Sequence, residues 1–198
     1  VSLIPVFGWF VVFGWSLEIA RRVILDDPQP LPRLDFINDF VRGLKGLVLN
    51  VVYSLPALVV VIPVGLLIGL ASIGTESRWF LGVNLVGALC LTGAAVVYGV
   101  VLMFILPAAY GQLVAEEESL EAALNVKAIF KKVRTAPAAY LLVAVGQILS
   151  AFIASFGAAA CVIGVIVTTT YTFSIMGHLY GQAHKETRAL EGKQVAGN

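Results

Sequence analysis

Charged residues are scarce in this sequence of 198 residues and are absent from long parts of it. Only 13% of the chain is Asp, Glu, Lys or Arg, about half the share in a soluble domain, whereas 59% is hydrophobic. Four stretches contain no charged residue at all: 1–17, 46–75, 79–115 and 135–184. This scarcity excludes an ordinary soluble protein and predicts an all-α fold, a multi-pass bundle of transmembrane helices.

Motifs of the common enzyme classes are missing as well. No glycine-rich phosphate loop, HExxH or GxSxG occurs, and the two cysteines lack a zinc-binding spacing. No ionisable residue falls in the middle of a predicted span, where pumps and transporters usually keep one. We therefore expect no catalytic residue, no metal site, no cofactor and no nucleic-acid partner.

The charge-free stretches predict five membrane crossings within a single membrane domain, 1–198. About 20 apolar residues in a helix cross the hydrocarbon core once. The last stretch is too long for one crossing, so we predict a break near Ser155–Cys161. The predicted spans are 3–20, 44–70, 80–107, 138–156 and 161–181, with loops at 21–43 and 110–137 and a tail at 182–198.

Basic residues fall almost entirely on one side of this topology. Eleven of the thirteen lie in the two loops and the tail, Lys45 lies at the same end of the second span, and only Arg78 lies on the other side. The positive-inside rule then makes these loops cytoplasmic, in a cytoplasmic membrane, with the amino terminus outside and the carboxyl terminus inside. The candidate contacts for anionic lipids are Arg21, Arg22, Arg42, Lys45, Lys127, Lys131, Lys132 and Arg134.

Each cytoplasmic loop contains the pattern of an interfacial amphipathic helix. In the first loop, a proline-rich turn at 26–32 precedes apolar residues spaced by three and four: Leu34, Ile37, Val41 and Leu44. The polar residues that fill the other face are Asp35, Asn38, Asp39, Arg42 and Lys45. In the second loop, Ser119 is a predicted N-cap, and a rough apolar face follows it at Leu120, Ala123, Leu124, Phe130 and Val133.

Several residues inside the spans are candidates for packing or binding. Two pairs of glycines spaced by four, Gly65 with Gly69 and Gly177 with Gly181, allow close approach of another helix. Pro56 and Pro63 would kink or break the second span. His178 is a weak candidate ligand for haem or a pigment, and we do not expect it to serve as one.

The segment GWSLEIARRVILDDPQPLPRLDFINDFVRGLKGLVLNVVY, residues 14–53, resembles a family of prokaryotic integral membrane proteins known as domain of unknown function 4013. The similarity lies in Gly14, in the pair Arg21 and Arg22, in the acidic and proline-containing turn, and in the Gly-Leu-Lys that enters the next span. The end of the chain, GHLYGQAHKE, is similar too. The resemblance implies a multi-pass membrane fold and assigns neither an activity nor catalytic residues.

These observations favour a non-enzymatic accessory or scaffold subunit, which contacts the lipid bilayer and packs against the other subunits of a larger membrane complex, such as an energy-transducing one. A small transporter or channel is the first alternative and predicts a polar cavity at mid-membrane. An enzyme acting on lipid headgroups is a weaker one. It predicts that Asp35 and Asp39 converge with Asp26 or Asp27 on a metal ion.

Overall fold

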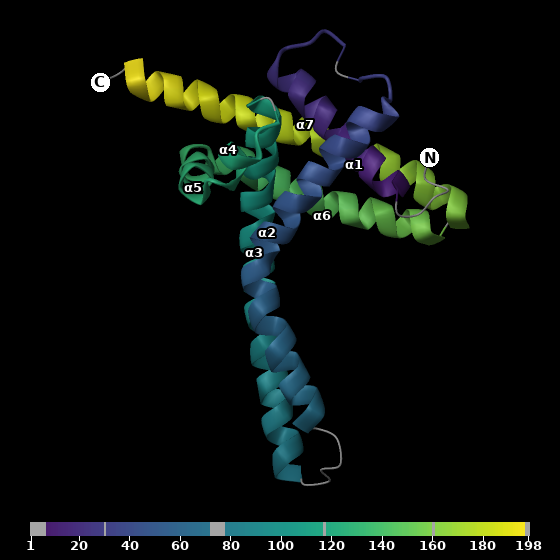
Figure 1. The fold of residues 1–198 in the computed structure, drawn as a ribbon, viewed down its shortest axis with the longest axis vertical. Coiled ribbons are helices and arrows are strands. Elements are labelled where there is room, and N and C mark those ends of the chain that lie inside the picture. Colours follow the sequence, from purple (N-terminus) through teal and green to yellow (C-terminus); the bar gives the residue numbers. More distant parts are fainter. Residues whose placement is uncertain (1–6, 30, 72–77, 117, 160, 197–198) are drawn as a thin grey trace. The chain divides into compact units, whose positions relative to one another are not determined.

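The computed structural model describes residues 7–29, 31–71, 78–116, 118–159 and 161–196. These residues form seven α-helices and no strand (Figure 1), so the predicted all-α class is confirmed. The helices are α1 Phe7–Ile24, α2 Phe36–Ala71, α3 Arg78–Ala115, α4 Leu120–Leu124, α5 Val126–Thr135, α6 Pro137–Ala159 and α7 Cys161–Ala196. By its contacts the chain divides into two compact units, Val1–Asn50 with Met103–Asn198, and Val51–Leu102.

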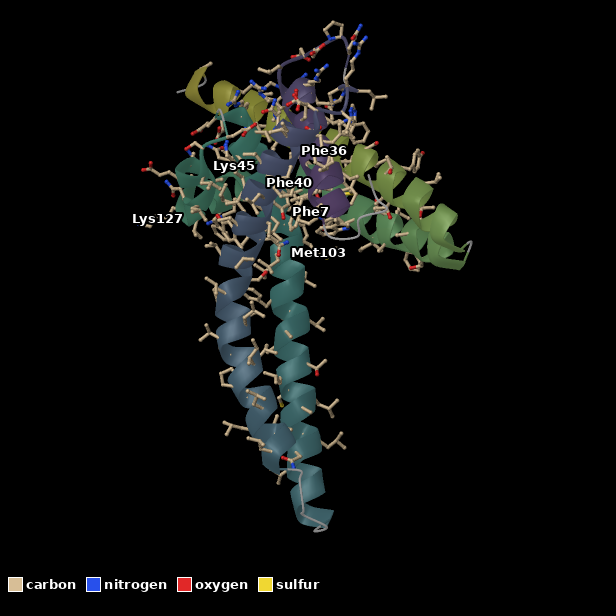
Figure 2. All side chains as sticks on the ribbon, turned by 45° about the vertical axis from the view of Figure 1, so that its right-hand side comes forward. Phe7, Phe36, Phe40, Lys45, Met103 and Lys127 are labelled. Atoms are coloured by element: carbon tan, nitrogen blue, oxygen red, sulfur yellow. The ribbon has the colours of Figure 1, made fainter. Side chains whose placement is uncertain are left out.

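The smaller unit, Val51–Leu102, is a hairpin formed by the second part of α2 and the first part of α3, which run side by side (Figures 1 and 2). Each part contributes roughly 20 to 25 residues, or about 30 to 38 Å of helix, which matches the thickness of the hydrocarbon core. The side chains of Val59, Leu67 and Val97 each remain 67% exposed. Because so much apolar surface is uncovered, this hairpin belongs in lipid or against another membrane protein.

The prolines of the second span do not interrupt it. α2 continues through both Pro56 and Pro63. Near the first of them, the Tyr98 hydroxyl donates a hydrogen bond to the Tyr53 carbonyl oxygen at 2.6 Å, the kind of neighbouring donor that allows proline in membrane helices. A cavity of about 210 Å³ beside Pro56 is lined by aliphatic side chains and Tyr98. It is not the polar cavity that the transporter alternative predicts.

The larger unit is built around α7, which packs against both α6 and α1 (Figure 1). Its core contains Leu17 from α1, Leu113 from α3 and Tyr140 from α6, all essentially buried. Aromatic rings join these helices, with the Phe13 ring centroid 5.4 Å from that of Tyr110. The predicted break near Ser155–Cys161 is confirmed, because α6 ends at Ala159 and α7 begins at Cys161.

The prediction of a separate interfacial helix in the first loop is wrong. α2 is one helix from Phe36 to Ala71, so the amphipathic segment continues directly into the second span. Its apolar residues Ile37, Val41 and Leu44 are exposed, whereas Asp39 and Arg42 are buried. Protein therefore covers Asp39 and Arg42, whose charges are compensated by ion pairs, while Asp35 and Asn38 of the polar face stay exposed, and the apolar face is left for the membrane.

The other loop and tail boundaries also differ from the prediction. α1 continues to Ile24 and α3 to Ala115, and α7 is helical through the predicted tail up to Ala196. The second amphipathic segment is split into α4 and α5. Ser119 caps α4 as predicted, by accepting a hydrogen bond from the Ala122 amide, and Asn125 caps α5 in the same way through the Ala128 amide.

Three helices among the described residues are long and apolar enough to cross a membrane, where the sequence predicts five spans. They contain Phe36–Leu70, Gly82–Ala115 and Pro137–Ser155. α1 is not among them, and it carries Glu18, Arg21 and Arg22 within its 18 residues. The described side chains in the second half of α7 include many polar groups. Membrane contact through several helices is thus supported, and five crossings remain a prediction.

Candidate functional site

A cluster of ionised side chains lies inside the larger unit, centred on Arg42 of α2. The guanidinium donates from Nε to Glu118 Oε1 at 2.8 Å and from Nη1 to Asp39 Oδ1 at 3.0 Å, and its Nη2 lies 3.1 Å from Glu18 Oε2. Lys45 Nζ donates to the other oxygen of Glu118 at 2.7 Å. We call these five residues, Glu18, Asp39, Arg42, Lys45 and Glu118, the Arg42 cluster.

The Arg42 cluster connects three parts of the chain that are distant in sequence. Glu18 lies on α1, the residues from Asp39 to Lys45 lie on the first turns of α2, and Glu118 precedes α4. Figure 2 shows Phe36, Phe40 and Lys45 along these turns, with the Phe7 ring stacked 5.9 Å from that of Phe40. The cluster therefore fixes α2 against α1 and against the segment between α3 and α4.

Ion pairing compensates the burial of these charges. The Arg42 side chain is only 8% exposed, and an isolated cation at such depth would be strongly destabilising. Burial alone would raise the pKa of Glu118, but the hydrogen bond from Lys45 and the charge of Arg42 outweigh it, and the pKa is lowered. Glu118 also has a positive φ of 64°, a strained conformation for a residue with a side chain.

A polar cavity of about 820 Å³ adjoins the cluster. It lies among α1, the loop before α2 and the first turns of α2. Its charged lining consists of Arg21, Arg22, Arg33, Arg42, Glu18, Asp35 and Asp39, and its apolar lining of Leu31, Pro32, Leu34 and Phe36. The volume lies within the range of small-molecule binding sites.

Hydrogen bonds from α1 hold the loop that forms one wall of this cavity. Trp15 Nε1 donates to the Pro32 carbonyl oxygen at 3.0 Å, and Arg22 Nη1 donates to that of Gln29 at 3.1 Å. The Gln29 amide donates to the Asp27 carboxylate at 2.9 Å. Since proline removes backbone donors from this loop, side chains supply the contacts that fix it.

The four aspartates of the first loop do not converge. Asp26 pairs with Lys185, Asp27 with Arg22, and Asp39 with Arg42. Asp35 accepts hydrogen bonds from both the backbone and the side-chain amide of Asn38, and these lower its pKa. In the described part of the chain, no group of three His, Cys, Asp or Glu side chains is placed to hold a metal ion.

The basic residues predicted to contact lipid fall into two groups, those on α1 and the first turns of α2 and those on α5. Arg22, Arg42 and Lys45 form ion pairs within the protein, and Arg21 lies 3.7 Å from Glu18 with its side chain 42% exposed.

On α5 the exposed side chains are Val126, Lys127, Phe130, Lys131 and Arg134. The Arg134 guanidinium lies over the Phe130 ring, 5.8 Å from its centroid. Lys132 is only partly exposed, and burial lowers its pKa in spite of the nearby Glu191 carboxylate. α5 thus presents a mixed basic and apolar surface, as interfacial helices do.

Glycines set the closest helix contacts of the larger unit. A Cβ atom at Gly177 would overlap the Ser16 carbonyl oxygen, and one at Gly181 would lie 2.7 Å from Val23 Cβ. The predicted pair on α7 therefore lies directly against α1. Gly65 and Gly69 on α2 have no such neighbour within 4 Å.

The sequence analysis did not identify a second glycine contact, between α1 and α2. A Cβ atom at Gly14 would overlap the Asp39 carbonyl oxygen, and one at Gly43 would overlap that of Phe10. The two residues are far apart in sequence and neither belongs to a spaced pair, so the small-residue pattern did not reveal them.

The two histidines have different environments. His178 is exposed and lines an apolar cavity of about 330 Å³ with Ile19 and Leu179. His184 is 1% exposed, and neither of its ring nitrogens has a hydrogen-bond partner. Burial, together with the charges of Lys132 and Arg188, lowers the pKa of His184 to about 3. In the sequence, His184 lies in the predicted tail after the span 161–181, a position that does not indicate a buried side chain.

One comparison with known proteins identifies a family. The model of the family described as protein of unknown function DUF4013 matches residues 1–176. The fold and the match together define a helical membrane protein of unknown function. The chain belongs to the DUF4013 family. No curated protein and no solved structure matches it.

Proposed function

We propose that this protein is a non-enzymatic accessory or scaffold subunit that packs against other subunits of a membrane complex. The observation that supports this proposal is the apolar surface of the smaller unit. Large aliphatic side chains along both helices of the hairpin are exposed, and so is the glycine pair on α2. Glycines that face no helix of their own chain offer a flat surface to a helix of another.

The larger unit has internal support of its own. Its Arg42 cluster joins α1, the first turns of α2 and the segment before α4. In this proposal the Arg42 cluster has a structural role, because each of its carboxylates already has a cationic partner.

Orientation is part of the same proposal. The basic residues of the first loop, of α5 and of the end of α7 would lie on the cytoplasmic side of a prokaryotic membrane, by the positive-inside rule. This arrangement requires that α7 also crosses, and a crossing by α1 as well gives five spans with the amino terminus outside.

The experiment is gentle extraction from native membranes, followed by native electrophoresis and mass spectrometry of the proteins that migrate with this chain. The test variant is Gly65→Val with Gly69→Val, which adds volume to the proposed contact. The matched control is Leu66→Val with Leu70→Val on the same turns of α2, where both side chains are already exposed.

We expect partners in fixed stoichiometry with the unmodified chain and with the control, and loss of those partners from the glycine variant. Two results would reject the proposal: a chain that migrates alone, or partners that the glycine variant retains. The first would favour the transporter alternative, and uptake assays in vesicles would follow.

A further inference from the structure

We propose that the polar cavity of about 820 Å³ binds one phospholipid molecule, with the phosphodiester held by Arg21 and Arg33 and the acyl chains lying along α2. This site is separate from the apolar hairpin on which the proposed function depends. Three features of the cavity support this proposal: its exposed arginines, its net charge and the apolar surface that leads away from it.

Two of the arginines that line the cavity are available to a ligand. Arg22 and Arg42 are held by carboxylates at 3.2 Å or less. Arg21 lies 3.7 Å from Glu18, beyond hydrogen-bonding distance, and Arg33 is exposed and forms no ion pair with any described residue. A guanidinium presents a planar set of donors that matches phosphate oxygens.

The charge of the lining selects the ligand. Four arginines face the cavity together with Glu18, Asp35 and Asp39, an excess of one positive charge. A phosphodiester carries one negative charge and balances it. Asp35 has no cationic partner among the ion pairs of the described residues, and its carboxylate can accept a hydrogen bond from a headgroup hydroxyl. This favours a monoanionic phospholipid with hydroxyls on its headgroup, such as phosphatidylglycerol.

An apolar surface begins at the mouth of the cavity, which makes a lipid a better occupant than free phosphate. Leu34 and Phe36 line the cavity and are exposed. The exposed side chains that continue along α2 are Ile37, Val41, Leu44 and Val48. They recur at three and four residues and cover about 16 Å of helix.

The experiment counts phospholipids on the purified full-length protein by native mass spectrometry, after extensive detergent washing. The protein is then reloaded with phosphatidylglycerol, phosphatidylethanolamine or phosphatidylcholine. The test variant is Arg21→Gln with Arg33→Gln, and the control is Arg188→Gln with Lys193→Gln, which removes the same charge from exposed positions on α7. Neither arginine of the test variant belongs to the Arg42 cluster, and the elution profile checks that the variants fold.

We expect one phosphatidylglycerol per unmodified or control chain, bound more tightly than the other two lipids. The affinity of the test variant should fall about tenfold or more, since each charge-assisted hydrogen bond contributes about a factor of ten. A second variant, Ile37→Ser with Leu44→Ser, should weaken retention of the lipid. Inorganic phosphate should not displace the lipid from the protein.

Three results would overturn the proposal. One is the absence of retained lipid on the unmodified protein, and another is equal retention by the arginine variant. The third is displacement of the lipid by millimolar inorganic phosphate, which would show that the cavity recognises the free anion. Preference for ethanolamine or choline headgroups would contradict the argument from net charge.

Discussion

Replacing Arg42 with methionine should destabilise the larger unit and weaken the effect of acid on its stability. Arg42 is the cation shared by Glu18, Asp39 and Glu118, at distances of 2.8 to 3.1 Å. Methionine fills similar space, but Asp39 then loses its only cationic partner among the ion pairs of the described residues, while Lys45 still pairs with Glu118 and Arg22 with Glu18. Removing one partner from a buried ion pair costs about 3 to 5 kcal/mol. For a chain of this length that corresponds to a decrease of about 6 to 20 °C in melting temperature.

The pH dependence separates this mechanism from a simple loss of packing. In the unmodified protein the pKa of Glu118 is lowered, so its ion pairs stabilise the fold above the ordinary value of 4.5, and this stabilisation is lost as the pH falls through the lowered pKa. In the variant, protonation instead relieves repulsion between the carboxylates. The contribution of the cluster to stability should therefore rise in Arg42→Met as the pH falls from 7 to 5. Both proteins share the loss of stability from His184 in this range, so the melting temperature of Arg42→Met should fall less than that of the unmodified protein.

The assay is thermal unfolding in detergent at several pH values, with Arg188→Met as the control because Arg188 is exposed. Adding Asp39→Asn to Arg42→Met should recover part of the stability, since Asp39 has no other cationic partner among the ion pairs of the described residues. If Arg42→Met were as stable as the control at pH 7, or if acid destabilised it as much as it does the unmodified protein, the reasoning about the Arg42 cluster would be refuted.

Three further predictions concern other parts of the chain. Gly177→Ala should lower the stability by about 1 to 3 kcal/mol through overlap with α1, whereas Gly192→Ala on the same helix, which has no neighbour within 4 Å, should be neutral or slightly stabilising in thermal unfolding. The pKa of His184 is about 3, below its ordinary value of 6.5, so the free energy of unfolding should fall by about 1.4 kcal/mol per pH unit as the pH falls below 6.5. His184→Gln should abolish this dependence on pH, and a variant with an unchanged dependence would contradict the prediction. In a chain without its native cysteines, impermeant thiol reagents should label Lys193→Cys and Leu31→Cys from the same side if α7 crosses the membrane in addition to the three candidate helices, and from opposite sides if only those three cross.

The elements of this fold could largely be predicted from the sequence because the membrane imposes a simple rule. Charge-free stretches of sufficient length become helices, and the break near Ser155–Cys161 followed from length alone. The N-cap at Ser119 was predictable because it depends on local chemistry. Whether α1 crosses was less predictable, since its charged end is compatible with either a crossing or a buried position.

The Arg42 cluster could be predicted only in part. Asp39 and Arg42 are three residues apart on one helix, so their pairing is a local feature. Glu118 lies 76 residues from Arg42, and nothing in the sequence indicates which of the acidic residues near α4 reaches it. The pattern of apolar residues over 34–44 predicted the two faces of the helix correctly. Such a pattern separates an apolar face from a polar one, but it does not say which of the two the rest of the protein covers.

The glycine contacts on both sides of α1 also fix its position along its own axis. Gly14 meets the backbone of α2, and Gly177 of α7 meets the backbone of α1 at Ser16. If α1 moved by one helical turn, Phe10 or Glu18 would have to occupy the place of Gly14, where not even a methyl group fits. α1 therefore has a single allowed position along its axis. Any conformational change that moves this helix must also move the first turns of α2 and the helix α7.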